Sequence, residues 1–234
     1  MRVGAIQSSF IPWRGYFDFI ASVDTFVFLD DVQYTVRDWR NRNKIKTPRG
    51  TEWLTVPVVH GGRRSLINET KIDYSQNWTR KILGAWTANY GRAEFYEVAL
   101  GMLYTIEATQ HETLSSVNTQ LTQLVCEYLG IDTPLRSSLA FDLVGEKTNR
   151  LIDLLKKLHA TTYLSGPSAD AYLDKDAFRK NGIRLEYKSY DYAPYPQLWG
   201  PFEGAVTVLD LIANCGLDAR RLIRSRMPDQ VIIR

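Results

Sequence analysis

The sequence has few of the residues that build metal centres and disulfide frameworks. It contains two cysteines and three histidines among 234 residues. Cys126 and Cys215 lie far apart and follow no metal-ligand spacing, so we expect reduced thiols and no zinc site. No apolar run approaches the length of about 18 residues that marks a membrane-spanning helix, and no secretion signal is visible at the start. We therefore expect a cytoplasmic protein without a membrane span.

The chain also has no large excess of charge of either sign. The formal net charge is +3 and the basic residues are spread along the chain, so no electrostatic footprint for nucleic acid is present. The apolar content of 44% and charged content of 24% are typical of a soluble globular protein. No internal repeat or linker is visible. We expect one domain over residues 1–234, with an α/β core at 1–95 and 130–234 and a helical segment at 96–130.

Two stretches alternate strand and helix in the way of a βαβ unit. Residues 3–6 form an apolar strand, a loop with Pro and Gly follows, residues 18–23 suit a short helix, and residues 25–29 suit a second strand. A similar order recurs between residues 161 and 187. Such units are right-handed and parallel. The sequence predicts a Rossmann-like α/β core with a mainly parallel sheet and helices on both faces.

The other predicted elements are less diagnostic of the fold. Their expected ranges are strands at 53–59, 67–72 and 135–139, helices at 77–90, 149–158 and 206–215, and a largely helical stretch at 96–129. Pro57 indicates either that the strand at 53–59 lies at the edge of a sheet or that Pro57 stands at an end of the strand. Gly216 suits the position after a helix. Residues 60–65 read HGGRRS, a basic loop whose glycines admit a phosphate but which is more often just a mobile loop.

The stretch at residues 26–46 carries the strongest sign of a binding site. A strand of apolar residues ends at Asp30 and Asp31, and a loop dense in guanidinium, amide and aromatic groups follows. The polar loop at 7–16 follows another strand. Both loops fall at the carboxyl edge of a parallel sheet, where ligands of such folds bind. The plainer alternative is a charged surface hairpin.

The expected substrate-binding residues share side chains that recognise anions, hydroxyls or rings. Cationic groups can clamp phosphate or carboxylate, amides can bind sugar hydroxyls, and aromatic rings can stack on a base or sugar. A Ser-Gly turn before a helix can bind an anion or can simply cap the helix. The set comprises Gln7, Trp13, Tyr16, Gln33, Trp39, Arg40, Asn41, Arg42, Lys46, Ser165, Gly166, Ser168, Tyr195 and Gln197.

Six segments carry a resemblance to a known family. QSSFIPWRGYF, FVFLDDVQY, WRNRNKIKT, WLTVPV, YLSGPSADAYLD and YPQLWGPFEGAVTVLDLIANCG occur in this order and span nearly the whole chain. The chain resembles the WbqC-like protein family. Members are commonly encoded with O-antigen, other surface-polysaccharide or specialised-metabolite genes. The resemblance implies a cytoplasmic enzyme that modifies an amino sugar or related small molecule, with acyl or aminoacyl transfer to an amine as the expected step.

The sequence departs from the family near its start. Ile6 stands where many members have His or Met, and Ser8 where they have Pro, so no histidine is available there. His60, His111 and His159 lie outside the matched segments, which disfavours a Ser-His-Asp or Cys-His nucleophile.

The candidate catalytic residues are therefore Asp30 and Asp31. One can act as a general base on an amine, or the pair can hold Mg²⁺ on a diphosphate. Consecutive side chains in an extended segment point to opposite faces, so we expect different roles, with Asp31 facing the pocket and Asp30 fixing the loop through Arg40, Arg42 or a backbone N–H.

The residue types are also compatible with a second class of function. The same arginines suit a non-catalytic protein that binds a nucleotide-sugar or assists a glycosyltransferase. A small-molecule substrate is expected in both cases. The sequence leaves open the donor, the acceptor, any need for ATP or a metal, and the oligomeric state.

Overall fold

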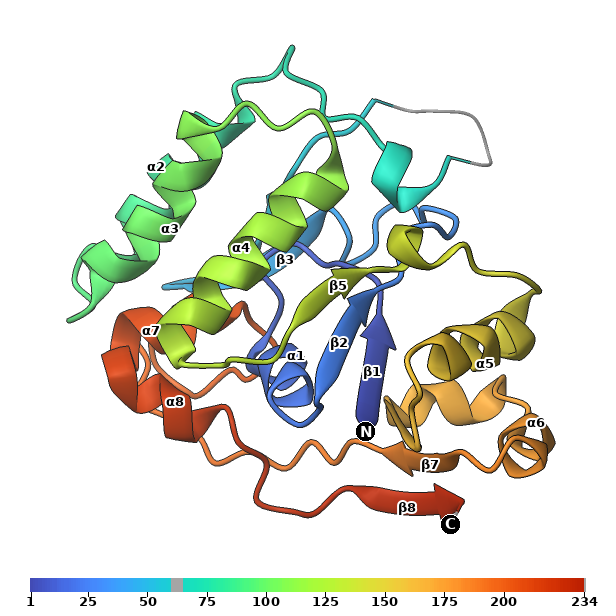
Figure 1. Cartoon of the computed structure of the whole chain (residues 1–234). Helices are drawn as coiled ribbons and strands as arrows, with labels where there is room; N and C mark the ends of the chain where they lie inside the picture. Colours follow the sequence, from blue (N-terminus) through green and yellow to red (C-terminus); the bar gives the residue numbers. More distant parts are fainter. Residues whose placement is uncertain (60–64, 234) are drawn as a thin grey trace.

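The computed structural model describes residues 1–59 and 65–233. Residues 60–64 of the basic loop predicted at 60–65 lie outside the described residues. A six-stranded sheet forms the centre of the molecule, in the order β5-β2-β1-β6-β7-β8 (Figure 1). Its strands are β1 (Arg2–Ile6), β2 (Thr25–Phe28), β5 (Leu135–Ser137), β6 (Thr162–Ser165), β7 (Arg184–Tyr187) and β8 (Gln230–Ile233).

All neighbouring strands pair in parallel except β7 and β8, which are antiparallel. The predicted α/β core with a mainly parallel sheet is confirmed. The chain runs outward from β1 through β2 to β5, and then returns to the other side of β1 with β6 and β7. The direction of winding therefore reverses between β1 and β6, and their carboxyl ends flank the crevice where such sheets bind ligands.

Helices cover both faces of the sheet because strand residues on both faces are apolar. Phe26 and Phe28 of β2 belong to one buried cluster, and Val27 between them belongs to the other. The first cluster takes in α1 (Arg14–Ile20), α2 (Trp78–Tyr90), α3 (Tyr96–Ala108), α4 (Leu114–Leu129), α7 (Val208–Cys215) and α8 (Ala219–Leu222). The second takes in α5 (Lys147–Lys157) and α6 (Lys175–Lys180). Figure 1 shows α2, α3 and α4 gathered on one side of the sheet and α5 and α6 on the other.

Several element boundaries differ from the sequence prediction. The stretch at 96–129 is largely helical, as predicted, and consists of two helices; Thr113 caps the second, α4, by accepting a hydrogen bond from the backbone N–H of Ser116. The first helix begins at Arg14 rather than near residue 18. The predicted strand at 67–72 is a 3₁₀ turn over Ile67–Glu69. The last strand, β8, was not predicted.

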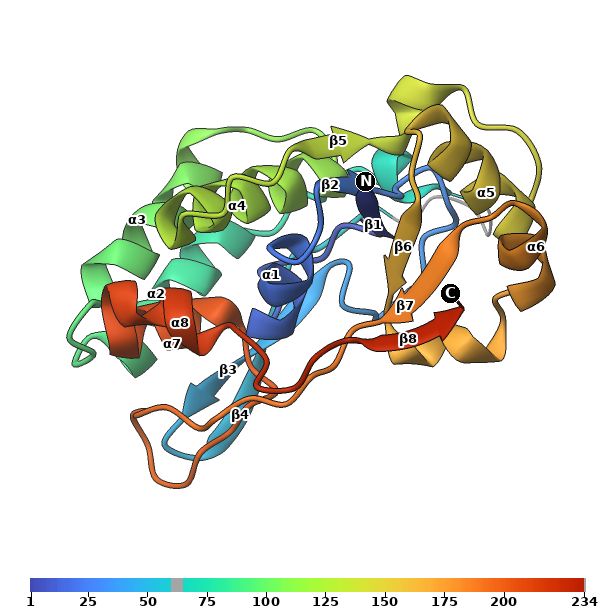
Figure 2. The ribbon, with the colours of Figure 1, turned by 60° about the horizontal axis from the view of Figure 1, so that its bottom comes forward.

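A separate two-stranded hairpin, β3 (Arg42–Thr47) and β4 (Gly50–Thr55), carries part of the stretch that the sequence predicted to be a loop. The strand expected at 53–59 ends at Thr55, before Pro57. The inner row of β3 is buried although Asn43 is polar, because its amide donates to the carbonyls of Phe10 and Ile11. Figure 2 shows the hairpin beside the long loop between β7 and α7, residues 188–207, which is called the C-terminal loop below.

Candidate functional site

Asp30 stands directly beyond β2 and is 2% exposed. One carboxylate oxygen accepts a hydrogen bond from the backbone N–H of Ser8, 2.7 Å away, and the other accepts from the hydroxyl of Ser115 on α4. Both oxygens are therefore occupied, and the side chain ties the loop after β1 to the start of α4. This arrangement makes Asp30 an anchor of the carboxyl edge.

Asp31 points to a different set of partners. The Ser138 hydroxyl donates to one carboxylate oxygen at 2.6 Å, and the Arg150 guanidinium forms an ion pair with the other. The side chain retains 10% exposure. Each oxygen keeps a second lone pair, which can accept a hydrogen bond from a bound group.

The partners of the two acids were not predicted from the sequence. Ser115, Ser138 and Arg150 come from α4, the turn after β5 and α5, far along the chain. None of them follows a motif that marks a site. Of the three kinds of partner expected for Asp30 (Arg40, Arg42 or a backbone N–H), the described residues supply a backbone N–H, that of Ser8.

Arg40 and Tyr16 hold the backbone of the loop after β1. The guanidinium of Arg40 donates to the carbonyls of Gln7 and Ser8 at 3.0 and 3.1 Å, and the Tyr16 hydroxyl donates to the Gln7 carbonyl at 3.1 Å. Burial, reinforced by the charge of Asp30, raises the pKa of Tyr16. Gln7, Tyr16, Asp30 and Arg40 thus lie together at one edge of the sheet.

The predicted Ser-Gly turn follows β6, next to β1 in the sheet, and aromatic rings lie near it. Ser165 is buried, whereas Gly166 and Ser168 reach solvent. A Cβ atom built on Gly166 would lie 3.9 Å from the Tyr190 hydroxyl. The rings of Trp13 and Tyr190 are 5.2 Å apart. Tyr190 is an addition to the predicted residues, which from the same stretch included Tyr195 and Gln197.

Gln197 bonds to both Lys46 and Tyr195, and the contacts of this group lead to Asp210 rather than to Asp30 or Asp31. The Lys46 ammonium donates to the Gln197 amide oxygen at 3.0 Å. Gln197 and the hydroxyls of Tyr90 and Tyr195 donate to the buried Asp210 at 2.6–2.8 Å. Burial raises the pKa of Asp210, against the opposing effect of these hydrogen bonds. The cluster fastens the hairpin and the C-terminal loop to α2 and α7.

The remaining predicted residues lie on or near the hairpin. Asn41 is buried and donates to the Val56 carbonyl. Trp39 is 43% exposed, and the Arg42 guanidinium lies over the Trp53 ring. Gln33 is exposed and forms a β-bridge with Leu66.

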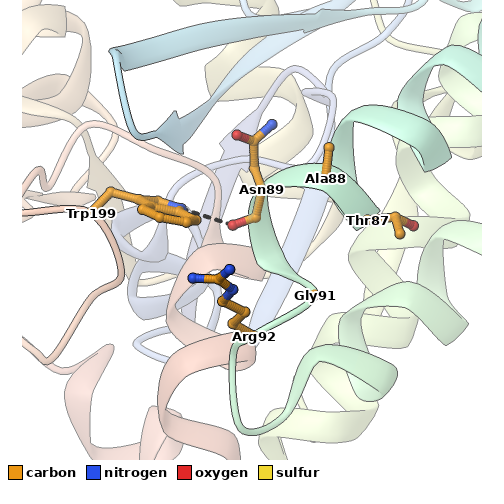
Figure 3. Close-up of a pocket in the computed structure, with 6 residues that line it drawn as sticks. All are labelled: Thr87, Ala88, Asn89, Gly91, Arg92 and Trp199. Carbon is orange, nitrogen blue, oxygen red and sulfur yellow. Dashed lines mark hydrogen bonds between the residues drawn. The ribbon is translucent and has the colours of Figure 1, made fainter.

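A hollow of about 370 Å³ lies away from the acids, at the end of α2 (Figure 3). The Trp199 indole N–H donates to the Asn89 carbonyl across its wall at 2.8 Å. Its lining residues are Thr87, Ala88, Asn89, Gly91, Arg92 and Trp199, none of which was predicted to bind the substrate.

Residues 1–59 and 65–233 contain neither a group of metal ligands nor a membrane-spanning helix. Within these ranges no three His, Cys, Asp or Glu side chains are grouped so that they could hold a metal ion. No helix in the same ranges is long and apolar enough to span a bilayer.

Comparison with known proteins gives one family and one curated relative. The model of the WbqC-like protein family matches residues 7–222. An uncharacterized protein of Mycobacterium tuberculosis is 47% identical over 228 residues, which cover 95% of this chain and 97% of that protein. No solved structure matches.

Proposed function

Since the chain belongs to the WbqC-like protein family, we propose that it is an enzyme of surface-polysaccharide (O-antigen) or related small-molecule biosynthesis. Its reaction is the transfer of an acyl or aminoacyl group to the amine of an amino sugar or nucleotide-sugar. The site is the carboxyl edge of the main sheet, and Asp31 is the general base.

The position of Asp31 is the observation that carries this proposal. Its carboxylate follows β2 at the carboxyl edge of the sheet, is held by Ser138 and Arg150, and is partly open to solvent. Asp30 is more deeply buried, at 2% exposure, and its bonds to Ser8 and Ser115 tie the loop after β1 to α4, so it positions that loop instead. Fixed orientation by neighbouring groups is what a general base requires.

The chemical step follows from these assignments. The amine nitrogen attacks the carbonyl carbon of the acyl donor, a C–N bond forms, and the bond from that carbon to the leaving group breaks. Asp31 accepts the proton that the nitrogen loses and returns it to the leaving group. The loop after β1 and the turn at Gly166 flank the crevice that would receive the sugar.

The second candidate is a nucleotide-sugar-binding or glycosyltransferase-accessory protein. It is favoured by the pairing of Asp31 with Arg150, since ion-paired acids also serve purely structural roles. A binding protein needs no free base, and the ion pair with Arg150 compensates the negative charge of Asp31.

Product formation separates the two candidates. The purified protein is incubated with nucleotide-linked amino sugars and with acyl thioesters, or with amino acids plus ATP, and products are identified by mass. We expect a product heavier by the acyl group, formed about 10²–10⁴ times more slowly by Asp31→Asn. Asp176→Asn is the matched control, because Asp176 is exposed and paired only on its own helix.

Two results would count against the enzyme. Normal melting with undiminished turnover in Asp31→Asn would remove Asp31 from the chemistry. Binding of the nucleotide-linked sugars without product from any donor would favour the accessory protein.

A further inference from the structure

The outer face of the β3–β4 hairpin combines cations with an exposed indole. Strand residues alternate between faces. On the inner face Asn43, Ile45 and Thr47 of β3 and Leu54 of β4 are buried, whereas Glu52 is exposed. Lys44 lies directly across from Trp53 in the pairing of the two strands. The outer row consists of Arg42, Lys44, Lys46, Thr51, Trp53 and Thr55, and contains no acid.

Two indoles on this face are open to solvent. Trp53 is 42% exposed and Trp39, at the end of the preceding loop, is 43% exposed. Their ring centroids are 5.2 Å apart and their planes are tilted by 43°. Large amphipathic rings exposed side by side are characteristic of binding surfaces.

Cations lie over the Trp53 ring. The Arg42 guanidinium carbon is 4.1 Å and the Lys44 ammonium 5.1 Å from the ring centroid. Within the described residues Lys44 forms no ion pair, and the Arg42 side chain donates only to the Arg37 carbonyl. Lys46 differs, because its ammonium is turned to Gln197 and Gly200. Two positive charges on this face are therefore uncompensated by acids.

The indole and cation surface adjoins the carboxyl edge of the main sheet. The Trp39 carbonyl accepts a hydrogen bond from the Phe10 N–H at 3.0 Å, and the next residue, Arg40, contacts the Gln7 carbonyl. The same short segment therefore connects this surface to the loop after β1. Figure 2 shows the hairpin extending from the body of the protein.

We propose that this face, formed by Trp39, Arg42, Lys44 and Trp53, is the subsite for the nucleoside diphosphate part of a nucleotide-sugar. The base stacks on the exposed indoles, and the diphosphate lies against Lys44 and Arg42. The inference rests on the proposed function, because it specifies the acceptor as a nucleotide-linked sugar. The sugar then extends toward Gln7 and Asp31.

The chemistry of the face favours this ligand over a free sugar. A sugar ring can stack on one indole but leaves the two cations without a counter-charge. A nucleoside diphosphate supplies a flat ring, which can stack on the indoles, and two adjacent anionic groups, which can pair with the cations. The absence of acids from the outer row removes the repulsion that a diphosphate would otherwise meet.

Binding of uridine diphosphate, measured by calorimetry without any acyl donor, tests the proposal. We expect Trp53→Ala and Trp39→Ala to weaken binding roughly 5- to 150-fold each, the loss associated with a stacked base. Lys44→Ala should weaken uridine diphosphate and pyrophosphate alike. The matched control is Arg49→Ala, since Arg49 lies on the same hairpin, is 88% exposed and faces Glu52.

Comparison of ligands separates stacking from simple anion binding. Uridine diphosphate should bind the wild type more tightly than pyrophosphate, and Trp53→Ala should remove that advantage. Equal affinities of the two ligands for the wild type would overturn the proposal, as would an equal loss in Arg49→Ala. If Trp53→Ala does not fold, Trp39→Ala and Lys44→Ala decide the outcome.

The assay is independent of the transfer reaction. A protein that acylates a free amino sugar but does not bind uridine diphosphate would refute this subsite and leave the proposed function standing. Tight, indole-dependent binding without any transfer would support the subsite and favour the accessory protein.

Discussion

The carboxylate of Asp30 accepts a hydrogen bond from the backbone N–H of Ser8 at 2.7 Å, and this bond joins the segments just beyond the neighbouring strands β1 and β2. The acid is buried and also accepts from Ser115. It therefore determines where the loop after β1 runs, including the position of Gln7 beside it.

Replacement of this acid tests its anchoring role. Asp30→Asn should lower the free energy of unfolding by about 1.5–3 kcal/mol, because an amide loses the charge and presents a donor where two donors already point. Urea unfolding measures the change. The exposed Asp132→Asn should differ from the wild type by no more than about 0.5 kcal/mol. Equal stabilities would show that the bonds to Asp30 contribute little.

The Asp31–Arg150 pair should be energetically coupled. Its members are 10% and 30% exposed and belong to different elements. A double-mutant cycle with Asp31→Asn and Arg150→Gln should give a coupling energy of about 0.5–3 kcal/mol from unfolding curves. Strictly additive effects would mean that the pair does not hold the carboxylate in solution.

Two glycines should respond in opposite ways to alanine. Gly216 has a φ of 54° at the end of α7, and an added Cβ would come within 2.7 Å of the Phe95 ring, so Gly216→Ala should destabilise by about 1–3 kcal/mol. Gly84 lies within α2 with nothing near its Cβ direction, so Gly84→Ala should stabilise by about 0.5–1 kcal/mol. Thermal melting distinguishes the two.

The buried Asp210 should make stability depend on pH. Burial raises its pKa above the ordinary value of 3.8, so the native state holds the proton more tightly than the unfolded state. Its contribution is fully present below pH 3.8 and is lost as the pH rises through the folded pKa.

Asp210→Asn lacks this titration. Its stability relative to the wild type should therefore improve as the pH rises from about 4 to 7. Unfolding curves across this range measure the difference, and a difference that stays constant with pH would contradict the raised pKa.

The fold could be predicted wherever periodicity and burial agree. The strands at 3–6 and 25–29 are apolar and bounded by polar loops, and they form β1 and β2 in parallel. β8 escaped prediction because its first residues are exposed at the sheet edge, so tertiary pairing rather than an apolar pattern makes it a strand. β3 escaped because Asn43 occupies an inner position through hydrogen bonds that local sequence does not reveal.

The candidate site was only partly accessible to such reasoning. Position at a strand end placed Gln7, Asp30 and Asp31 at one edge, since parallel strands share a direction. The partners that give the two acids different surroundings come from distant helices and turns. Asp31 and Arg150 are separated by 119 residues in the chain, so no local sequence pattern predicts their ion pair.

The strand order also governs the sequence of events during folding. β1 lies between β2 and β6 in the sheet. Its pairing with β6 joins residues that are far apart in the chain, such as Arg2 and Thr162. On the ribosome, one edge of β1 therefore stays unpaired until β6 has been synthesised. Such an edge can pair with other chains, and non-local pairing of this kind folds slowly. Of the six strands of this sheet, β1 is synthesised before the others, but both of its edges are paired only after β6 has followed.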